Sequence, residues 1–275
     1  MRAQLGGSSR QSLVAARALL DASVKGVDAN SASAFSSELF FAADLLGSSI
    51  SVRRALTDPA RDSAAKASLI KDLMASKVGA PALALLSELS SLRWSGAKDL
   101  VQVIEQLAIE AEASSANISG ELDRVENEIF VISNTISNSS ELRKAFKSDA
   151  VNAKKQLAAD LLKNASSSTT KLTSQLVNSW RGRSIESAFA DYQWALAARR
   201  NRVIALVRVA SPITQLQQDR LATALTTQVG QPVRMNIEVD PTVLGGVSVN
   251  FADEIFDGSV SNRLAGAARA LAGSK

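Results

Sequence analysis

The chain contains no histidine and no cysteine, and only 4% of its 275 residues are aromatic. Without histidine it lacks the usual general acid–base near neutral pH and the commonest metal ligand. Without cysteine it has no thiolate nucleophile, no disulfide and no thiolate metal site, which fits a reducing, cytosolic compartment. Most common catalytic constellations are therefore excluded. The composition predicts a non-enzymatic protein that binds no cofactor and no metal.

Long apolar runs are also missing. No stretch approaches the ~18 uninterrupted apolar residues of a membrane span, and the N-terminal segment MRAQLGGSSRQS has no apolar core of signal-peptide length. We therefore expect a soluble protein whose link to a membrane, if it has one, runs through a partner. The net charge of +4 is mild for this length, so it permits an anionic partner without requiring one.

Helix-forming residues fill most of the chain. The hydrophobic fraction is 46%, and Ala, Leu and Ser are abundant, as in helices that pack closely through small residues. Apolar residues recur every three or four positions, for example at Leu13, Ala16, Leu20 and Val24, which is the pattern of amphipathic helices. The pattern predicts helices over residues 12–25, 34–46, 62–74, 82–94, 98–113 and 122–136.

Part of this helical sequence is repeated. Each of three short segments has a counterpart 87 to 90 positions later, in the same order: Val52–Leu56 with Leu142–Phe146, Lys71–Met74 with Ala159–Leu162, and Ser87–Leu89 with Ser174–Leu176. Trp94 and Trp180 follow the last pair at a similar spacing. Such a period favours an internal duplication of a helical bundle. We expect a first bundle over residues 1–113 and a second over residues 114–200.

The period changes after Asn201. The segment over 203–209 is rich in β-branched residues, with Arg208 as its one polar residue, and the segment over 233–239 alternates strictly between apolar and polar residues. Both patterns predict strands, the second of them half-buried. Thr214 is placed to cap a helix between them. A third alternating segment over 247–251 and a final apolar stripe after Val260 complete a β-α-β-β-α unit over residues 201–275. The predicted class is mainly α: two tandem helical bundles followed by a small α+β domain.

Two motifs suggest other activities. Ser63-Ala64-Ala65-Lys66 matches the S-x-x-K pattern of serine acyltransferases, but neither S-D-N nor K-T-G occurs, so we interpret it as a solvated helix face. The arginine clusters at 181–183 and 199–202 raise the alternative of a basic helical nucleic-acid-binding module. That alternative predicts salt-dependent retention of DNA or RNA. Few aromatic residues stand nearby to stack on bases, and cations at helix ends also complement the helix dipole, so we expect no nucleic-acid partner.

The C-terminal run from Asp240 to Ser259 carries backbone-shaping residues. Gly245-Gly246 precedes a strand and matches no phosphate-binding loop, so we expect a bulge or a close backbone approach there. Asp257-Gly258-Ser259 is typical of a turn that opens a helix. These are structural residues rather than a chemical site.

This run resembles the C-terminal signature of one family, the delta subunit of the bacterial F-type ATP synthase, which is called the oligomycin-sensitivity-conferring protein in mitochondria. The signature is an acidic residue, a short apolar step, a glycine pair, an alternating strand and then Asp-Gly-Ser; here its residues are Asp240, Gly245, Gly246, Asp257, Gly258 and Ser259. Ordinary members have one helical bundle before it. Two bundles resemble the enlarged form of actinobacteria.

The resemblance implies a stator role in the peripheral stalk, on the cytoplasmic face of the bacterial plasma membrane. It implies contacts with the N-terminal segments of the alpha subunits of the catalytic head and with the C-terminal helix of the b-subunit stalk. Grooves of helical bundles hold partner helices through apolar anchors. The hypothetical groove linings are Leu85, Leu89 and Leu92 in the first bundle and Leu172, Leu176 and Trp180 in the second, and for each the alternative is plain bundle core.

Overall fold

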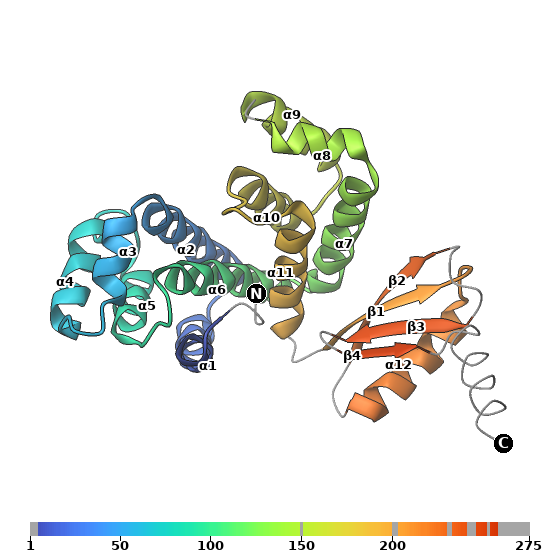
Figure 1. Ribbon diagram of the computed structural model, residues 1–275, viewed down its shortest axis with the longest axis horizontal. Coiled ribbons are helices and arrows are strands. Elements are labelled where there is room, and N and C mark those ends of the chain that lie inside the picture. Colours follow the sequence, from blue (N-terminus) through green and yellow to red (C-terminus); the bar gives the residue numbers. More distant parts are fainter. Residues whose placement is uncertain are drawn as a thin grey trace, which may run out of the picture. The chain divides into compact units, whose positions relative to one another are not determined.

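The computed structural model describes residues 5–148, 151–199, 203–229, 233–240, 246–251 and 254–257. The chain divides into two compact units, Met1–Leu196 and Ala197–Lys275. The first unit is helical, and the second contains the sheet (Figure 1). The predicted class, mainly helical with a small α+β unit at the C-terminus, is confirmed.

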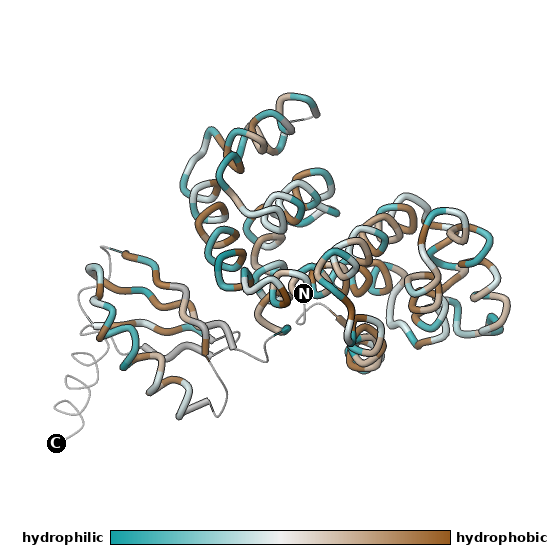
Figure 2. Tube along the Cα trace, turned by 180° about the vertical axis from the view of Figure 1, so that it is seen from behind, coloured by the Kyte–Doolittle hydropathy of each residue, from teal (hydrophilic) through white to brown (hydrophobic). Residues whose placement is uncertain are grey.

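The first unit begins with six helices: α1 (Gly7–Val24), α2 (Ala29–Ser48), α3 (Ile50–Thr57), α4 (Ser63–Met74), α5 (Ala80–Ser91) and α6 (Ala97–Ile118). Side chains of Asp28, Ser49 and Asp62 accept hydrogen bonds from backbone N–H groups at the starts of α2, α3 and α4, which satisfies donors that a helix leaves free. Apolar and polar residues alternate around the helices (Figure 2). The predicted stripe of α1 is buried.

Five more helices complete the unit: α7 (Leu122–Asn138), α8 (Ser140–Lys147), α9 (Val151–Leu161), α10 (Ser167–Asn178) and α11 (Ile185–Ala198). Ser139 and Ser166 cap α8 and α10. One apolar core runs through α1 to α11. Among the described residues, no helix is long and apolar enough to cross a membrane.

Helix α6 joins the two predicted bundles. Fourteen successive residues, from Val103 to Ala116, are all buried, so α6 packs around its whole circumference instead of along one stripe. It contacts α1, α2 and α3 as well as α7 and α10. The predicted boundary after residue 113 therefore falls inside a continuous helix, and the predicted bundles 1–113 and 114–200 belong to one compact unit, whose boundary lies at Leu196.

Two local contacts occur in both halves of this unit. Glu38 accepts a hydrogen bond from the backbone N–H of Gly79 at 3.0 Å, and Glu128 accepts one from that of Ser166 at 2.9 Å. The second contact is made by the short helices α3 and α8. In each, an arginine donates to a carbonyl near the end of the preceding helix. Arg53 Nη1 donates to Gly47, and Arg143 Nη1 donates to Ser137.

The helix pairings recur as well. Contacts of α1 with α5, α2 with α3, and α4 with α5 have counterparts in those of α6 with α10, α7 with α8, and α9 with α10. Helices α1 and α6 also end alike, each two residues before a glycine of positive φ, 74° at Gly26 and 73° at Gly120. We infer that α6 closes the first copy of the bundle and opens the second. In this arrangement α6 is also the first helix of the second copy.

The described residues of the second unit form a four-stranded sheet in the order β2-β1-β3-β4 and one helix, α12 (Gln215–Val229). Its strands are β1 (Val203–Val209), β2 (Val233–Val239), β3 (Val247–Phe251) and β4 (Glu254–Asp257). β1 pairs parallel with β2 and antiparallel with β3, and β3 pairs antiparallel with β4. The parallel pair needs a crossover, which α12 provides. The core is formed by Ala205, Val207, Val209, Leu225 and Val249. The predicted last helix lies outside the described residues.

Truncation of Phe146 tests the packing of the second half. Phe146 is fully buried and is the one buried residue of α8. We expect Phe146→Ala to lower the free energy of unfolding by about 3–5 kcal/mol, because the lost ring leaves a cavity. The measurement is urea unfolding followed by tryptophan fluorescence, since Trp94, Trp180 and Trp194 all lie in the first unit.

The matched control is Val131→Ala on α7, where the side chain is 60% exposed. Its effect should stay within about 0.5 kcal/mol. Equal effects of the two substitutions would contradict the described packing of α8.

Candidate functional site

The predicted groove residues lie in or beside the core. Leu85 and Leu89 on α5 and Leu172 and Leu176 on α10 are at most 3% exposed. Leu92 and Trp180 are partly buried just beyond the ends of those helices. Their burial favours the bundle-core alternative that the sequence left open for each of them.

The C-terminal signature shapes backbone where the structure describes it. The backbone N–H of Asp240 donates to the carbonyl of Val209 at 2.8 Å, which ties the end of β2 to β1. Gly246 has a φ of 82° directly before β3, a conformation that favours glycine. Asp257 is the last residue of β4. Gly245, Gly258 and Ser259 lie outside the described residues.

The interpretation of Ser63–Lys66 as a solvated helix face is wrong for Lys66. Ser63 is exposed, whereas Lys66 is 5% exposed. Lys66 shares the buried stripe of α4 with Ile70 and Met74, which follow at intervals of four residues. No hydrogen bond joins Ser63 to Lys66 in the structure as described, so the pair does not form a nucleophile and its base.

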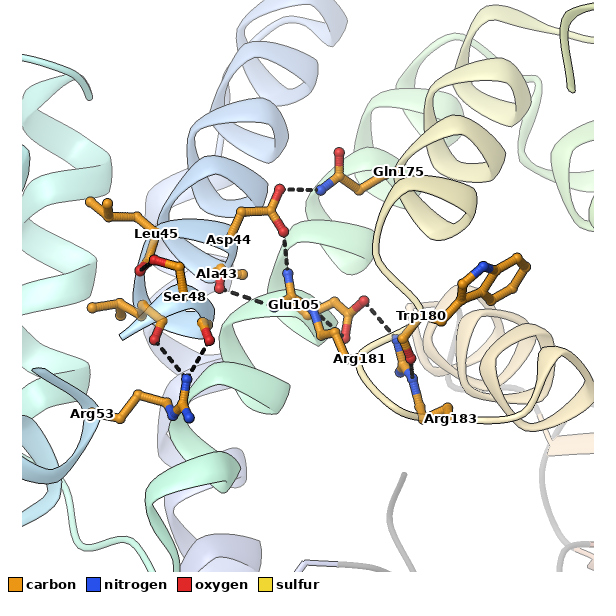
Figure 3. A network of polar contacts seen from close by, with 12 residues as sticks. Ala43, Asp44, Leu45, Ser48, Arg53, Glu105, Gln175, Trp180, Arg181 and Arg183 are labelled. Atoms are coloured by element: carbon orange, nitrogen blue, oxygen red, sulfur yellow. Dashed lines mark hydrogen bonds and ion pairs between the residues drawn. The ribbon is translucent and has the colours of Figure 1, made fainter. Parts of the chain in front are cut away.

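The arginine cluster at 181–183 faces inward. The backbone turns at Arg181 (φ 51°) and Gly182 (φ 74°) between α10 and α11. The Arg183 side chain is 8% exposed, and its Nη2 lies 2.8 Å from Oε1 of Glu105, a residue of α6 that is 1% exposed (Figure 3). Its Nη1 lies 3.0 Å from Asp191. Buried charges need such partners, because leaving water costs several kcal/mol for each ion.

The second arginine of the cluster reaches α2. Arg181 Nη2 donates to Asp44 at 2.6 Å, and its Nη1 donates to the carbonyl of Ala43 at 3.1 Å. Its Nε forms an ion pair with Glu105 Oε2 at 3.4 Å, without hydrogen-bond geometry. A Cβ on Gly47 would stand 2.6 Å from Arg181 Nη1, so glycine here leaves room for the guanidinium. Gln175 on α10 completes the contact by donating to Asp44 at 2.7 Å.

The electrostatic effects agree with this pairing. Burial is the largest effect and opposes the charge of Arg183, but the Glu105 carboxylate, together with Tyr192 and Asp191, outweighs it and raises the pKa of Arg183. Burial raises the pKa of Tyr192 well above its ordinary value, and Glu105, which accepts from the hydroxyl at 3.4 Å, raises it further. Glu105 therefore lies beside two guanidinium groups and a neutral phenol.

Two more carboxylates of α6 are held in the same way. Glu112 is bound by Lys171 of α10 at 2.8 Å, and the same ammonium group donates to Ser33 of α2. Glu110 pairs with Arg17 of α1 at 2.5 Å. Both carboxylates are 2% exposed. The buried acids of α6 thus connect helices from both halves of the unit.

Sequence reasoning missed these acids, although the signal was present. Glu105, Glu110 and Glu112 lie in a predicted helix that also carries other polar residues, so they resemble ordinary solvent-facing residues. Their partners lie up to 93 positions away along the chain. No group of acids suited to a metal ion occurs among the described residues. This arrangement can bind and position helices, but it offers no nucleophile beside a base.

A pocket of ≈ 520 Å³ lies beside this network. Its walls come from the end of α2, from α3, from α6 and from the segment after α10, and its lining residues are Asp44, Gly47, Ser48, Arg53, Lys98, Val101, Gln102, Asn178, Ser179 and Arg181. Arg181 fixes two of these walls to each other through its contacts with α2 and α6.

Comparison with known proteins decides the family. The family model of the ATP synthase delta (OSCP) subunit matches residues 109–271, from within α6 almost to the C-terminus. The chain belongs to this family. The ATP synthase subunit delta of Streptomyces coelicolor is 40% identical over 269 residues, which cover 97% of this chain and 98% of the relative. That of Kineococcus radiotolerans is 37% identical over 272 residues, with coverages of 97% and 98%. That of Nocardioides is 42% identical over 245 residues, with coverages of 87% and 88%.

Membership of the delta-subunit family makes the chain a non-catalytic stator component of the F-type ATP synthase. The expected resemblance to actinobacterial members is confirmed over nearly the full length.

Neutralising Glu105 tests the network. We expect Glu105→Gln to destabilise the first unit by about 3–5 kcal/mol, because Arg181 and Arg183 would lose their shared buried carboxylate and Arg183 would keep Asp191 alone. The control Asp44→Asn removes a partner of Arg181 that is 46% exposed and should cost at most about 1 kcal/mol. Urea unfolding measures both, and equal losses would show that Glu105 has no special role.

Proposed function

We propose that this chain joins the catalytic head to the peripheral stalk at the cytoplasmic face of the bacterial plasma membrane. In this proposal it binds N-terminal segments of the alpha subunits and the C-terminal helix of the b subunit. It thereby keeps the head from turning with the rotor, so that torque is converted to ATP synthesis. The observation that carries the proposal is membership of the delta-subunit family along nearly the whole chain.

The fold supports a mechanical role. A linker that resists torque must not let its parts slide past each other. In the first unit, α6 is shared by both halves. Ion pairs with its buried acids fix α10 and the following turn to α6, and the more exposed Arg181–Asp44 pair fixes that turn to α2. Ion pairs and hydrogen bonds have preferred directions, so they set a register that apolar contacts alone set less strictly.

Simultaneous binding tests the proposal. We expect the full-length chain to form a ternary complex with the purified catalytic head and a soluble b-subunit fragment, detected by native mass spectrometry. Each partner alone should also bind. A head that lacks the N-terminal segments of its alpha subunits is the control and should lose only the head contact. Absence of both binary complexes would refute the proposal.

A further inference from the structure

The pocket beside the network is rich in positive charge. Arg53, Lys98 and Arg181 line it, and Asp44 is the one carboxylate among its lining residues. Asp44 is already bound by Arg181 and Gln175, at 2.6 and 2.7 Å. The remaining cations of the pocket therefore lack a carboxylate of their own within the described structure.

Several hydrogen-bond donors in the pocket are unused. Arg53 donates through Nη1 to the carbonyls of Leu46 and Gly47 at the end of α2, and the described contacts give the rest of its guanidinium no acceptor. Lys98 is exposed on α6, and the described part of the chain gives it no partner. The same holds for the side-chain amides of Gln102 and Asn178.

The pocket is held in shape from both halves of the unit. Arg181 contacts α2 through Ala43 and Asp44 and contacts α6 through Glu105 (Figure 3). The opposite wall is α3, which Arg53 fastens to the end of α2. One wall is formed by the end of α10 and the segment after it, in the second half of the unit, whereas the other walls belong to the first half. A single bundle would therefore not form this pocket.

We propose that this pocket binds an acidic segment of a protein partner in the ATP synthase. In this proposal, partner carboxylates lie against Arg53 and Lys98, and the amides of Gln102 and Asn178 hold the partner's backbone or side chains. The inference rests on the proposed function, since it assigns a surface to one of the stator contacts.

The geometry favours a protein segment over a free phosphate. The donors come from side chains on separate elements, not from a glycine-rich loop whose backbone N–H groups surround one phosphate. The volume of ≈ 520 Å³ admits several side-chain atoms. Val101 adds an apolar side chain to the lining of the pocket, which a bare inorganic anion would not use.

Zero-length crosslinking tests the position of the partner. A carbodiimide joins a lysine amine to a carboxylate in direct contact without leaving a spacer. We expect Lys98 to be coupled to an Asp or Glu of the head or of the b-subunit fragment when the full-length chain is mixed with both. Peptide mass spectrometry identifies the pair. In the Lys98→Gln variant that crosslink should vanish while other crosslinks persist.

Binding by variants tests the energetic contribution. We expect Lys98→Glu and Arg53→Gln each to raise the Kd for one of the two partners by about tenfold or more, and to reduce its salt dependence. Arg143→Gln is the matched control. Arg143 makes the corresponding helix-end bond to Ser137 in the second half but does not line this pocket. It should therefore share the structural cost of Arg53→Gln without the loss of affinity.

The outcomes separate the two proposals. If the unaltered chain binds head and stalk, but Lys98→Glu and Arg53→Gln bind as well as the control Arg143→Gln and Lys98 forms no crosslink, the pocket proposal is overturned and the stator contacts stand. If the unaltered chain binds neither partner, the proposed function itself fails. If inorganic phosphate or ATP protects Lys98 from modification while both proteins leave it reactive, the pocket is a small-anion site and the proposal is wrong.

Discussion

The interaction on which the first unit depends is the burial of three carboxylates on one helix. Glu105, Glu110 and Glu112 lie on α6 at no more than 2% exposure. A buried carboxylate is tolerated where cations and hydrogen-bond donors replace its water. The donors here are Arg17, Lys171 and the turn after α10, so each acid selects a different neighbour. The packing of the two halves is fixed by charge matching in addition to apolar contact.

This pattern fits the work of a stator better than that of a flexible binding module. A helix that is buried around its whole circumference cannot rotate or shift without breaking contacts on every side. The left-handed turn at Arg181 and Gly182 places two guanidinium groups against Glu105 of α6, and that of Arg181 also reaches Asp44 of α2. In the proposed stator role, load applied to either half would pass to the other through one continuous helix and several directional bonds.

The sequence predicted what depends on short-range periodicity. The stripe of Leu13, Ala16, Leu20 and Val24 predicted α1, and the β-branched run over 203–209 predicted β1, whose Ala205, Val207 and Val209 are buried. It could not predict the buried network of ion pairs. Periodicity identifies a single buried stripe on a helix, whereas α6 is buried on all sides, its acids included. Lys66 was misjudged for a related reason: its aliphatic stem follows the stripe of Ile70 and Met74, while its charge suggests a surface position.

Shared use of α6 also limits how the chain can be shortened. Gly26 and Gly120 turn the backbone alike after α1 and α6, so an in-frame recombination between these two loops would join α1 directly to α7 and leave one bundle of ordinary outline. Yet α1 carries a single acid, Asp21, against the several of α6. In such a recombinant, the cations of α10 and of the turn after it would face a helix without the acids that now receive them. The two halves have become complementary partners, and neither is a spare copy of the other.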